Sequence, residues 1–305
     1  MKIIQFYKTT TDETLREIAA HGSDKFPIAY YVDDICQFDL GCIDWHWHRE
    51  VEFITVTKGT VNCLIGQNRI RLEKGCGIFI NSGTIHRFET DDGGIMPNIV
   101  FAPELIATER SLIHDTYILP VLSSGPAYQI LDPSISWQNT LLMVLHQIYD
   151  TQEQKGEPLS SLNTLLLTIE LWKHLFQNIN FELISAIGTK SAFQSSRLQI
   201  MLQFIHDHYV EHIGLEDIAN AANISKSSTL ETFRQGIGQS PVSYLIEYRL
   251  IQAAILLKNT KNTIYNISVV TGFSSAAYFC RKFKHFYKMT PAAYRKQTLH
   301  NIPSL

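Results

Sequence analysis

The chain has 305 residues, of which 45% are hydrophobic and 18% charged, a composition that excludes a disordered protein and fits two globular domains. Its net charge of −3 does not by itself indicate a polyanionic partner. However, residues 1–195 contain 14 Lys and Arg against 23 Asp and Glu, whereas residues 196–305 contain 12 against 6. The basic second part favours nucleic acid as its partner, although an ordinary basic surface would carry the same charge.

The start of the chain, Met1 to Phe6, lacks the apolar core of a signal peptide. No run of about 18 apolar residues is present, as a membrane-spanning helix requires. The five cysteines are odd in number and none has Cys-x-x-Cys spacing, which indicates reduced thiols. We therefore expect a cytoplasmic protein that does not bind membranes.

Residues 26 to about 103 contain short β-prone runs separated by turn residues. The runs are Val51–Thr57, Val61–Ile65, Arg69–Leu72, Gly77–Ile80 and Ile95–Phe101. Short strands at regular intervals are typical of an antiparallel sandwich or barrel.

Two motifs in this region resemble those of the cupin family of β-barrel proteins. Residues 41–52 (Gly-Cys-Ile-Asp-Trp-His-Trp-His-Arg-Glu-Val-Glu), with Gly59, resemble the first cupin motif, and residues 75–86 resemble the second. The match is imperfect, because the first motif is one residue short and because Asn81 and Thr90 replace the usual proline and asparagine. The resemblance implies a cupin-like barrel.

Four side chains in these motifs have the chemistry of a binding site. His46, His48 and Glu52 are evenly spaced, so on a single strand they would point to one side of the sheet. His86, from another strand, would complete three nitrogens and one oxygen, a set that suits Zn²⁺, Mn²⁺, Fe²⁺ or Ni²⁺. The alternative is a small-molecule effector site, in which the same four residues are the polar groups of an otherwise apolar pocket.

Residues 134–150 and 158–178 have helical spacing. An apolar stripe in the second has a repeat near 3.5 residues and consists of Leu159, Leu162, Leu166, Ile169, Trp172 or Lys173, and Phe176. The stripe either packs on the barrel or forms a dimer interface, and we expect a homodimer. Residues 180–196 lose this periodicity and gain small polar residues, which predicts a linker.

The last part of the chain contains two helix-turn-helix patterns about 49 residues apart. Each has an apolar-striped first helix, a short break (Ala222-Asn223 or Thr271-Gly272) and a second helix that begins with serine, a favourable N-cap residue. A predicted helix beginning at Pro241 joins them. Two such units on one rigid helix suit adjacent stretches of the DNA major groove.

The segment from Ser196 to Gln297 resembles the DNA-binding domain of the AraC/XylS family of bacterial transcription regulators. In its first part the matching residues are Ser225, Phe233, Gly238, Ser240-Pro241, Tyr244-Leu245, Arg249, Ala253 and Leu256-Leu257. In its second part they are Ile264, Ile267, Gly272-Phe273, Tyr278-Phe279, Arg281, Phe283-Lys284, Thr290-Pro291 and Tyr294-Arg295. The resemblance implies double-stranded DNA as partner, recognition helices over residues 226–235 and 275–285, and an N-terminal domain that binds an effector, most often a sugar.

The positions on these helices predict which residues face or flank DNA. They are Lys226, Ser227, Ser228, Glu231 and Arg234 in the first helix, and Ser275, Ala276, Ala277, Arg281, Lys282, Lys284 and His285 in the second. Glu231 stands where a basic residue is usual and repels phosphate unless it accepts a hydrogen bond from cytosine N4. Leu230 is expected to be exposed, toward a thymine methyl group. Phosphate contacts and DNA shape should therefore carry much of the recognition.

The aromatic residues of the two motifs have a different expected role. Phe233, Tyr278, Phe279 and Phe283 should form the cores of the helix-turn-helix units rather than stack on bases.

The predicted fold class is an α+β multidomain protein. An antiparallel, cupin-like effector-binding β-barrel with helices spans residues 1–133, a helical dimerisation segment 134–179, a linker 180–196, and an all-α domain with two helix-turn-helix motifs 197–305. The predicted function is a ligand-responsive transcription regulator, an activator in the commoner mode of the family, and not an enzyme.

Two alternatives remain. One is a metal-dependent cupin enzyme or metal sensor fused to a DNA-binding domain, which the His/Glu set favours and the lack of a general base outside that set disfavours. The other is a DNA-binding protein whose barrel only dimerises. The effector, the operator and the direction of the ligand's effect on DNA binding are left open.

Overall fold

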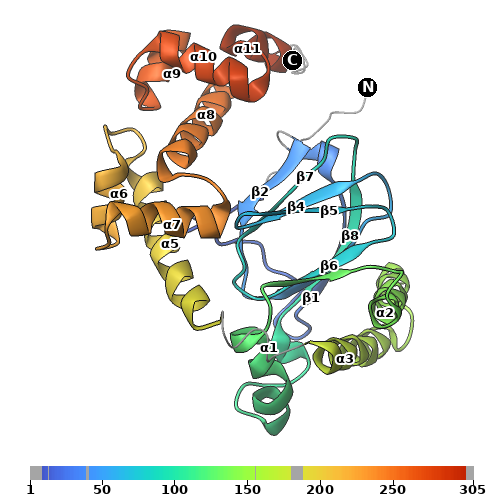
Figure 1. Cartoon of the computed structure of the whole chain (residues 1–305). Helices are drawn as coiled ribbons and strands as arrows, with labels where there is room; N and C mark the ends of the chain where they lie inside the picture. Colours follow the sequence, from blue (N-terminus) through green and yellow to red (C-terminus); the bar gives the residue numbers. More distant parts are fainter. Residues whose placement is uncertain (1–8, 13, 39–40, 155, 180–187, 300–305) are drawn as a thin grey trace. The chain divides into compact units, whose positions relative to one another are not determined.

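The computed structural model describes residues 9–12, 14–38, 41–154, 156–179 and 188–299 (Figure 1). The chain divides at Ser195 into two compact units, which we name the N-terminal unit and the C-terminal unit. Within the described residues, no helix combines the length and the apolar character needed to cross a membrane.

The N-terminal unit contains two antiparallel sheets, of strand order β1-β8-β3-β6-β9 and β2-β7-β4-β5. The strands of the five-stranded sheet are β1 (Ile28–Asp34), β8 (Ile95–Phe101), β3 (Val51–Thr55), β6 (Gly77–Ile80) and β9 (Tyr128–Leu131). Those of the four-stranded sheet are β2 (Cys42–His46), β7 (His86–Glu89), β4 (Val61–Ile65) and β5 (Asn68–Leu72). The prediction of short antiparallel strands is confirmed, with β9 as a strand beyond the predicted region.

Both faces of the five-stranded sheet are buried at its central strands. Since successive side chains of a strand point to opposite faces, Ile54 packs between the two sheets with Phe88, whereas Phe53 packs on the other face with Phe79. A sheet covered on both sides explains why β3 has no exposed residue and no alternation of apolar and polar side chains.

Two long helices cover the outer face of this sheet, α2 (Ser136–Glu153) and α3 (Ser160–Asn178), as predicted (Figure 1). Shorter helical elements complete the unit, namely η1 (Ile35–Gln37), η3 (Pro103–Leu105), η4 (His114–Ile118) and α1 (Leu119–Ser124). The side of α3 that faces the sheet buries Leu171, Trp172 and Leu175.

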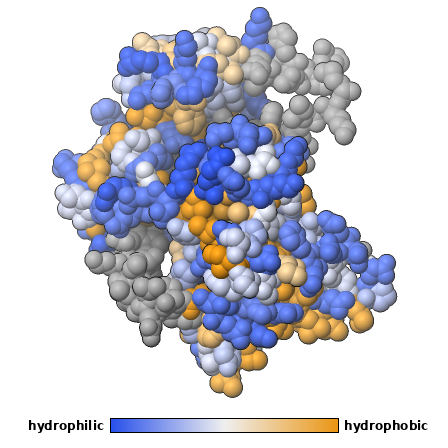
Figure 2. All heavy atoms as spheres, turned by 45° about the vertical axis from the view of Figure 1, so that its right-hand side comes forward, coloured by the Kyte–Doolittle hydropathy of each residue, from blue (hydrophilic) through white to orange (hydrophobic). Residues whose placement is uncertain are grey.

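The predicted apolar stripe on α3 is only partly exposed. Trp172 is buried and Phe176 packs against the same core, because both lie on the side of α3 that faces the sheet. The exposed part of the stripe consists of Leu159, Leu162, Leu166 and Ile169. Figure 2 shows apolar surface among hydrophilic atoms in the lower right of the view, the side on which Figure 1 places α2 and α3.

The predicted linker over residues 180–196 is only partly covered by the structure. Residues 180–187 lie outside the described residues, and residues 188–196 belong to the helix α5 (Gly188–His208), which continues to the buried Leu198. The linker itself stays a prediction.

The C-terminal unit is helical throughout its described length, which confirms the two predicted helix-turn-helix motifs. After α5 it contains α6 (Leu215–Ala221), α7 (Lys226–Ile237), α8 (Pro241–Asn259), α9 (Ile264–Val270), α10 (Ala276–Tyr287) and α11 (Pro291–Leu299). The serine N-caps are confirmed, because Ser225 Oγ accepts a hydrogen bond from Ser228 N (3.1 Å) and Ser275 Oγ accepts one from Tyr278 N (3.2 Å).

The turn of each helix-turn-helix motif contains one residue with a positive φ, Asn223 at +52° and Gly272 at +77°. At Gly272 a Cβ atom would lie 2.4 Å from Tyr209 O and 2.8 Å from Arg249 Nε. Arg249 is itself buried, and its Nε donates to Tyr209 O (2.7 Å). Glycine is therefore required here both by the backbone conformation and by the close approach of α8.

The aromatic core predicted for these motifs is confirmed. Phe233, Phe279 and Phe283 have no exposed surface. Tyr278 is partly buried and packs against the core of the second motif. These rings are therefore unavailable for stacking on bases.

Candidate effector site and DNA-binding surface

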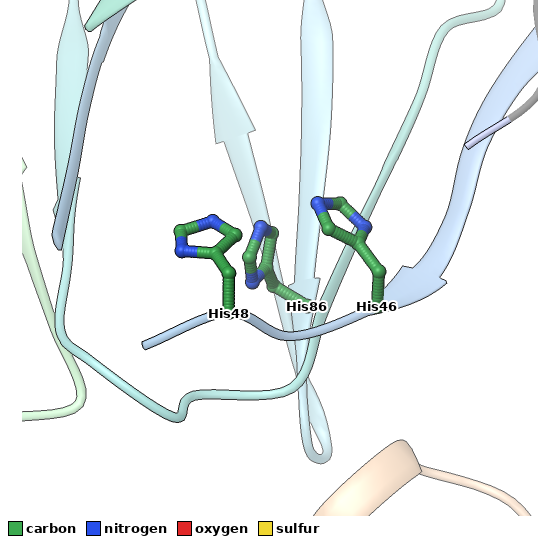
Figure 3. Close-up of side chains that lie close together, drawn as sticks. All are labelled: His46, His48 and His86. Atoms are coloured by element: carbon green, nitrogen blue, oxygen red, sulfur yellow. The ribbon is translucent and has the colours of Figure 1, made fainter. Parts of the chain in front are cut away.

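Four predicted site residues meet inside the N-terminal unit. His46 ends β2 and pairs with His86 at the start of β7, and their ring centroids are 4.1 Å apart. Glu52 Oε2 lies 3.5 Å from His48 Nε2 and 3.3 Å from His86 Nε2. Figure 3 shows the three imidazoles side by side, projecting to the same side of the backbone.

The reason expected for this convergence is wrong. His46, His48 and Glu52 do not share one strand, since β2 ends at His46 and β3 begins at Val51 in the other sheet. The chain crosses from one sheet to the other between these residues. Side chains from the two facing sheets therefore meet in the space between them.

Each of the three imidazoles is oriented by a backbone carbonyl. The Nδ1 atoms of His46, His48 and His86 lie 2.8, 3.1 and 2.8 Å from carbonyl oxygens of Asp44, Glu50 and Thr84, respectively. A carbonyl oxygen only accepts, so Nδ1 is the donor in each case. In a neutral ring Nε2 then has a free lone pair directed away from the carbonyl, as in metal-ligating histidines.

Burial and charge fix the ionisation of this cluster. Burial and the neighbouring His86 lower the pKa of His46 to about 3. Burial raises the pKa of Glu52, but the adjacent imidazoles of His48 and His86 outweigh it and hold this pKa well below its usual range. Burial alone would lower the pKa of His48, but the Glu52 carboxylate beside it has the opposite effect. The net result is a pKa of His48 above its usual value. The cluster thus combines an ionised carboxylate with a neutral imidazole.

The cluster leaves two buried acceptors without a hydrogen-bond partner. These atoms are Glu52 Oε2 and His86 Nε2. Two acceptors 3.3 Å apart repel each other unless a proton or metal cation lies between them. One nitrogen from each of His46, His48 and His86 lies within 4.8 Å of the other two. Three imidazole nitrogens with a nearby carboxylate fit a divalent transition metal.

The cluster borders a cavity of about 500 Å³, which we name the effector cavity. Its polar lining includes five residues that the sequence did not reveal as site residues, namely Glu17, His21, Tyr31, Asp33 and Asn98. Tyr31 and Asp33 are two residues apart on β1, so their side chains point to the same side of the sheet. The sequence alone does not give the strand pairing that shows which side faces the cavity. Glu17 and His21 lie in an irregular segment that has no recognisable motif.

The segment that carries Glu17 is attached directly to the histidine cluster. The backbone N–H of Glu17 donates to Trp47 O (2.9 Å), and the backbone N–H of Trp47, which lies between His46 and His48, donates to Leu15 O (3.0 Å). Burial raises the pKa of Glu17, but His21 and His46 lower it overall. His21 also stacks edge-on against His48, with ring centroids 5.5 Å apart.

The residues predicted to contact DNA lie on α7 and α10 of the C-terminal unit. Most of them are exposed, namely Lys226, Ser227, Ser228 and Arg234 on α7 and Ser275, Ala277, Arg281, Lys284 and His285 on α10 and its N-cap. The half-buried ones are Glu231 on α7 and Ala276 and Lys282 on α10. Leu230 is 43% exposed, as expected, while its neighbour Thr229 is buried and bonds to Ser225 O.

The two recognition helices differ in how their cations are paired. On α7, Lys226 Nζ lies 2.8 Å from Glu216 Oε2, and Arg234 Nη2 lies 2.8 Å from Glu231 Oε2. On α10, Arg281 and Lys282 lie over the Tyr278 ring, 5.4 and 5.6 Å from its centroid. Within the described part of the chain, neither has an acidic partner within 4 Å, so α10 is the more basic surface.

Comparisons with known proteins agree with both halves of the structure. Residues 218–297 match the model of a helix-turn-helix domain family, and residues 41–96 match that of the cupin domain. The chain is 31% identical over 288 residues to the uncharacterized HTH-type transcriptional regulator YdeC of Bacillus subtilis, which covers 93% of this chain and 97% of that protein.

Two other proteins are similar over the C-terminal part. The Msm operon regulatory protein of Streptococcus mutans is 30% identical over 144 residues, 47% of this chain and 52% of that protein. A solved regulator with an AraC-type DNA-binding domain from Chromobacterium violaceum is 28% identical, with 35% of this chain and 96% of that chain covered and a TM-score of 0.34. The two domain matches and the regulator over nearly the full length confirm the predicted resemblances, and nothing in them favours an enzyme.

The geometry of the cluster predicts metal retention. After incubation with Zn²⁺ or Ni²⁺ and desalting, the protein should keep about one ion per chain by inductively coupled plasma mass spectrometry, because one nitrogen from each of the three histidines lies within 4.8 Å of the other two, with the Glu52 carboxylate beside His48 and His86. The double variant His48→Ala, His86→Ala should keep none. A matched double variant of histidines outside the cluster, His174→Ala, His208→Ala, should behave as the wild type. Equal retention by the two double variants would contradict a site at the cluster.

Proposed function

Because the chain belongs to the AraC/XylS family of transcription regulators, we propose that it regulates transcription in response to a small molecule bound in the effector cavity. The observation that carries the proposal is the buried cluster of His46, His48, Glu52 and His86 beside this cavity, in the same chain as two helix-turn-helix motifs. Convergent polar groups in a mostly apolar cavity are the usual form of a small-molecule site. In keeping with the family, we propose activation as the mode, a carbohydrate-like polar molecule as the effector class, and the cytoplasm as the compartment.

For DNA binding we propose that α7 and α10 enter adjacent stretches of the major groove. The helix α8 joins the two motifs and has 19 residues, a length of roughly 28 Å. This approaches the ~34 Å repeat of the duplex, so both recognition helices can approach one face of it. The paired cations of α7 and the unpaired ones of α10 suggest that α10 supplies more of the phosphate affinity.

This asymmetry predicts unequal effects of alanine variants on binding to a 30-base-pair duplex. Arg281→Ala should weaken binding and reduce the slope of log K against log salt by about one, because one phosphate contact is lost. Arg234→Ala should have a smaller effect, since its charge is already offset by Glu231. Lys58→Ala, in the N-terminal unit, is the control. Fluorescence anisotropy over a salt series is the measurement, and equal slopes for Arg281→Ala and wild type would contradict the assignment.

We propose a homodimer formed through the exposed side of α3. Leu159, Leu162 and Leu166 are 65%, 50% and 56% exposed and recur near the spacing of a helix-pair interface. Met143 on α2, 58% exposed, adds a further apolar side chain. Exposed leucines at this spacing are more stable when a second copy covers them.

The dimer proposal predicts that Leu166→Glu produces a monomer, because the interface would bury an unpaired carboxylate. Light scattering coupled to size-exclusion chromatography measures the mass of each species. Leu112→Glu is the matched control, since Leu112 is 81% exposed and outside α3. A dimeric Leu166→Glu protein would rule out this interface.

We also propose that a divalent transition metal belongs to the effector site. His46, His48 and His86 would hold it through Nε2, with Glu52 as the oxygen ligand, and the two unpartnered acceptors support this. When bound, the ion would supply a coordination position for an oxygen or nitrogen of the effector. The chain's own contribution is to fix the three imidazoles through their carbonyl partners.

A further inference from the structure

The carboxylates that line the effector cavity are not matched by lysine or arginine. Glu17, Asp33, Asp34 and Glu52 all border it, and no lysine or arginine does among the described lining residues. A site for a carboxylate or phosphate ordinarily supplies arginine, lysine or clustered backbone N–H groups. The lining therefore disfavours an anionic effector.

Three of these four carboxylates have partners within the protein. Glu52 lies beside His48 and His86, and Glu17 Oε2 lies 3.3 Å from His21 Nε2. The carboxylate of Asp34 accepts hydrogen bonds from Cys36 N and from Gln37 Nε2, both at 3.1 Å. Asp34 is thus satisfied by hydrogen bonds, and Glu17 and Glu52 each have an imidazole beside them, although Glu52 Oε2 and His21 Nε2 make no hydrogen bond.

Asp33 is the exception. Its described side-chain contact is a hydrogen bond from the neutral Asn98, whose Nδ2 lies 2.7 Å from Oδ2. Burial, together with the charges of Glu52 and Glu17, raises the pKa of Asp33 to about 6, although the hydrogen bond from Asn98 lowers it in part. A buried carboxylate without a cation is unfavourable, and an ammonium group nearby removes that cost.

Asp33 and the histidine cluster border the same cavity at different places along the sheet. In the five-stranded sheet Glu52 is level with Val100 of β8, whereas Asp33 is level with Met96, four residues along the same strand. That separation corresponds to about 13 Å of backbone along the strand. The cavity lining also contains apolar side chains such as Phe88.

A second observation indicates a ligand in this space. His21 Nε2 and Glu52 Oε2 are buried atoms without a hydrogen-bond partner, and both residues line the cavity. Such groups are rare in folded proteins unless a ligand, ion or water meets them. The acidic lining and the unpartnered atoms thus belong to the same cavity.

We propose that the effector carries a cationic amine held by Asp33, and that the corresponding anion does not bind beside Asp33. The inference rests on the proposed function, that the effector binds in this cavity. The amine would form a charge-assisted hydrogen bond with the free Asp33 oxygen, while the rest of the molecule extends toward the histidines. Amino sugars and short alkylamines share this chemistry.

The test compares matched compounds on the full chain. Each of two sets contains a cationic, a neutral and an anionic compound with the same carbon skeleton. The first set is glucosamine, glucose and glucuronate, and the second is 1,4-diaminobutane, 1,4-butanediol and succinate. We expect the amine of at least one set to raise the melting temperature, and its acid to have no effect. Isothermal titration calorimetry of that amine should show at least a tenfold loss of affinity in Asp33→Asn.

Asp34→Asn is the matched control, because it removes the same charge from the adjacent residue, whose carboxylate has internal partners. Equal losses in the two variants, an acid that binds as tightly as its amine, or no stabilisation by any amine would overturn the inference. If a neutral compound binds, depends on His48 and His86 and is indifferent to Asp33→Asn, the cavity is an effector site but the cationic class is wrong. If no compound binds, the proposed effector cavity fails as well.

Discussion

The hydrogen bonds from three histidine Nδ1 atoms to backbone carbonyls organise the N-terminal unit around its candidate site. Each carbonyl belongs to a residue two positions from its histidine, so the strand ends and turns that carry the rings also orient them. The Nε2 atoms of His48 and His86 then face a buried carboxylate, Glu52, on the five-stranded sheet. Carboxylate and imidazole acceptors this close together need a proton or metal cation between them. Occupancy of this position would change the charge balance between the two sheets, as the proposed effector response requires.

The C-terminal unit depends on a different constraint, the close packing of the helix-turn-helix cores. Gly272 lies against Tyr209 O and the Arg249 side chain, and Arg249 in turn bonds to the carbonyls that follow α5. This arrangement ties α8 to the second motif and leaves the charged face of α10 exposed. The first motif has Asn223 in the corresponding turn and acidic partners for its cations. Two similar motifs thus present unequal electrostatic surfaces to the duplex.

Much of this could be predicted from the sequence where the pattern was local. The serine caps, the turn residues and the buried phenylalanines of the C-terminal unit follow from spacing along a single helix pair. The four cluster residues were also recognisable from the cupin motifs. Their geometry was not, because it depends on the chain crossing between sheets after His46. The even spacing of His46, His48 and Glu52 suggested a single strand, whereas these residues meet from two sheets.

Other features required the tertiary register. Asp33 and Asn98 meet because β1 pairs with β8, two strands separated by more than sixty residues. Neither residue belongs to a motif. The helix α5 over the second half of the predicted linker was not expected either, because its small polar residues show no apolar periodicity in the sequence.

The central claim is that occupancy of the effector cavity changes how the chain binds DNA. The most direct measurement is the affinity of the full chain for a duplex DNA, by fluorescence anisotropy, with the cavity empty and then occupied, first by Zn²⁺ alone and then by the tightest-binding amine. Coupling between two sites is typically 1–3 kcal/mol, so we predict a change of about fivefold or more that is absent in the His48→Ala, His86→Ala variant. A DNA affinity that stays within about twofold under both conditions, below that range of coupling, would contradict the account.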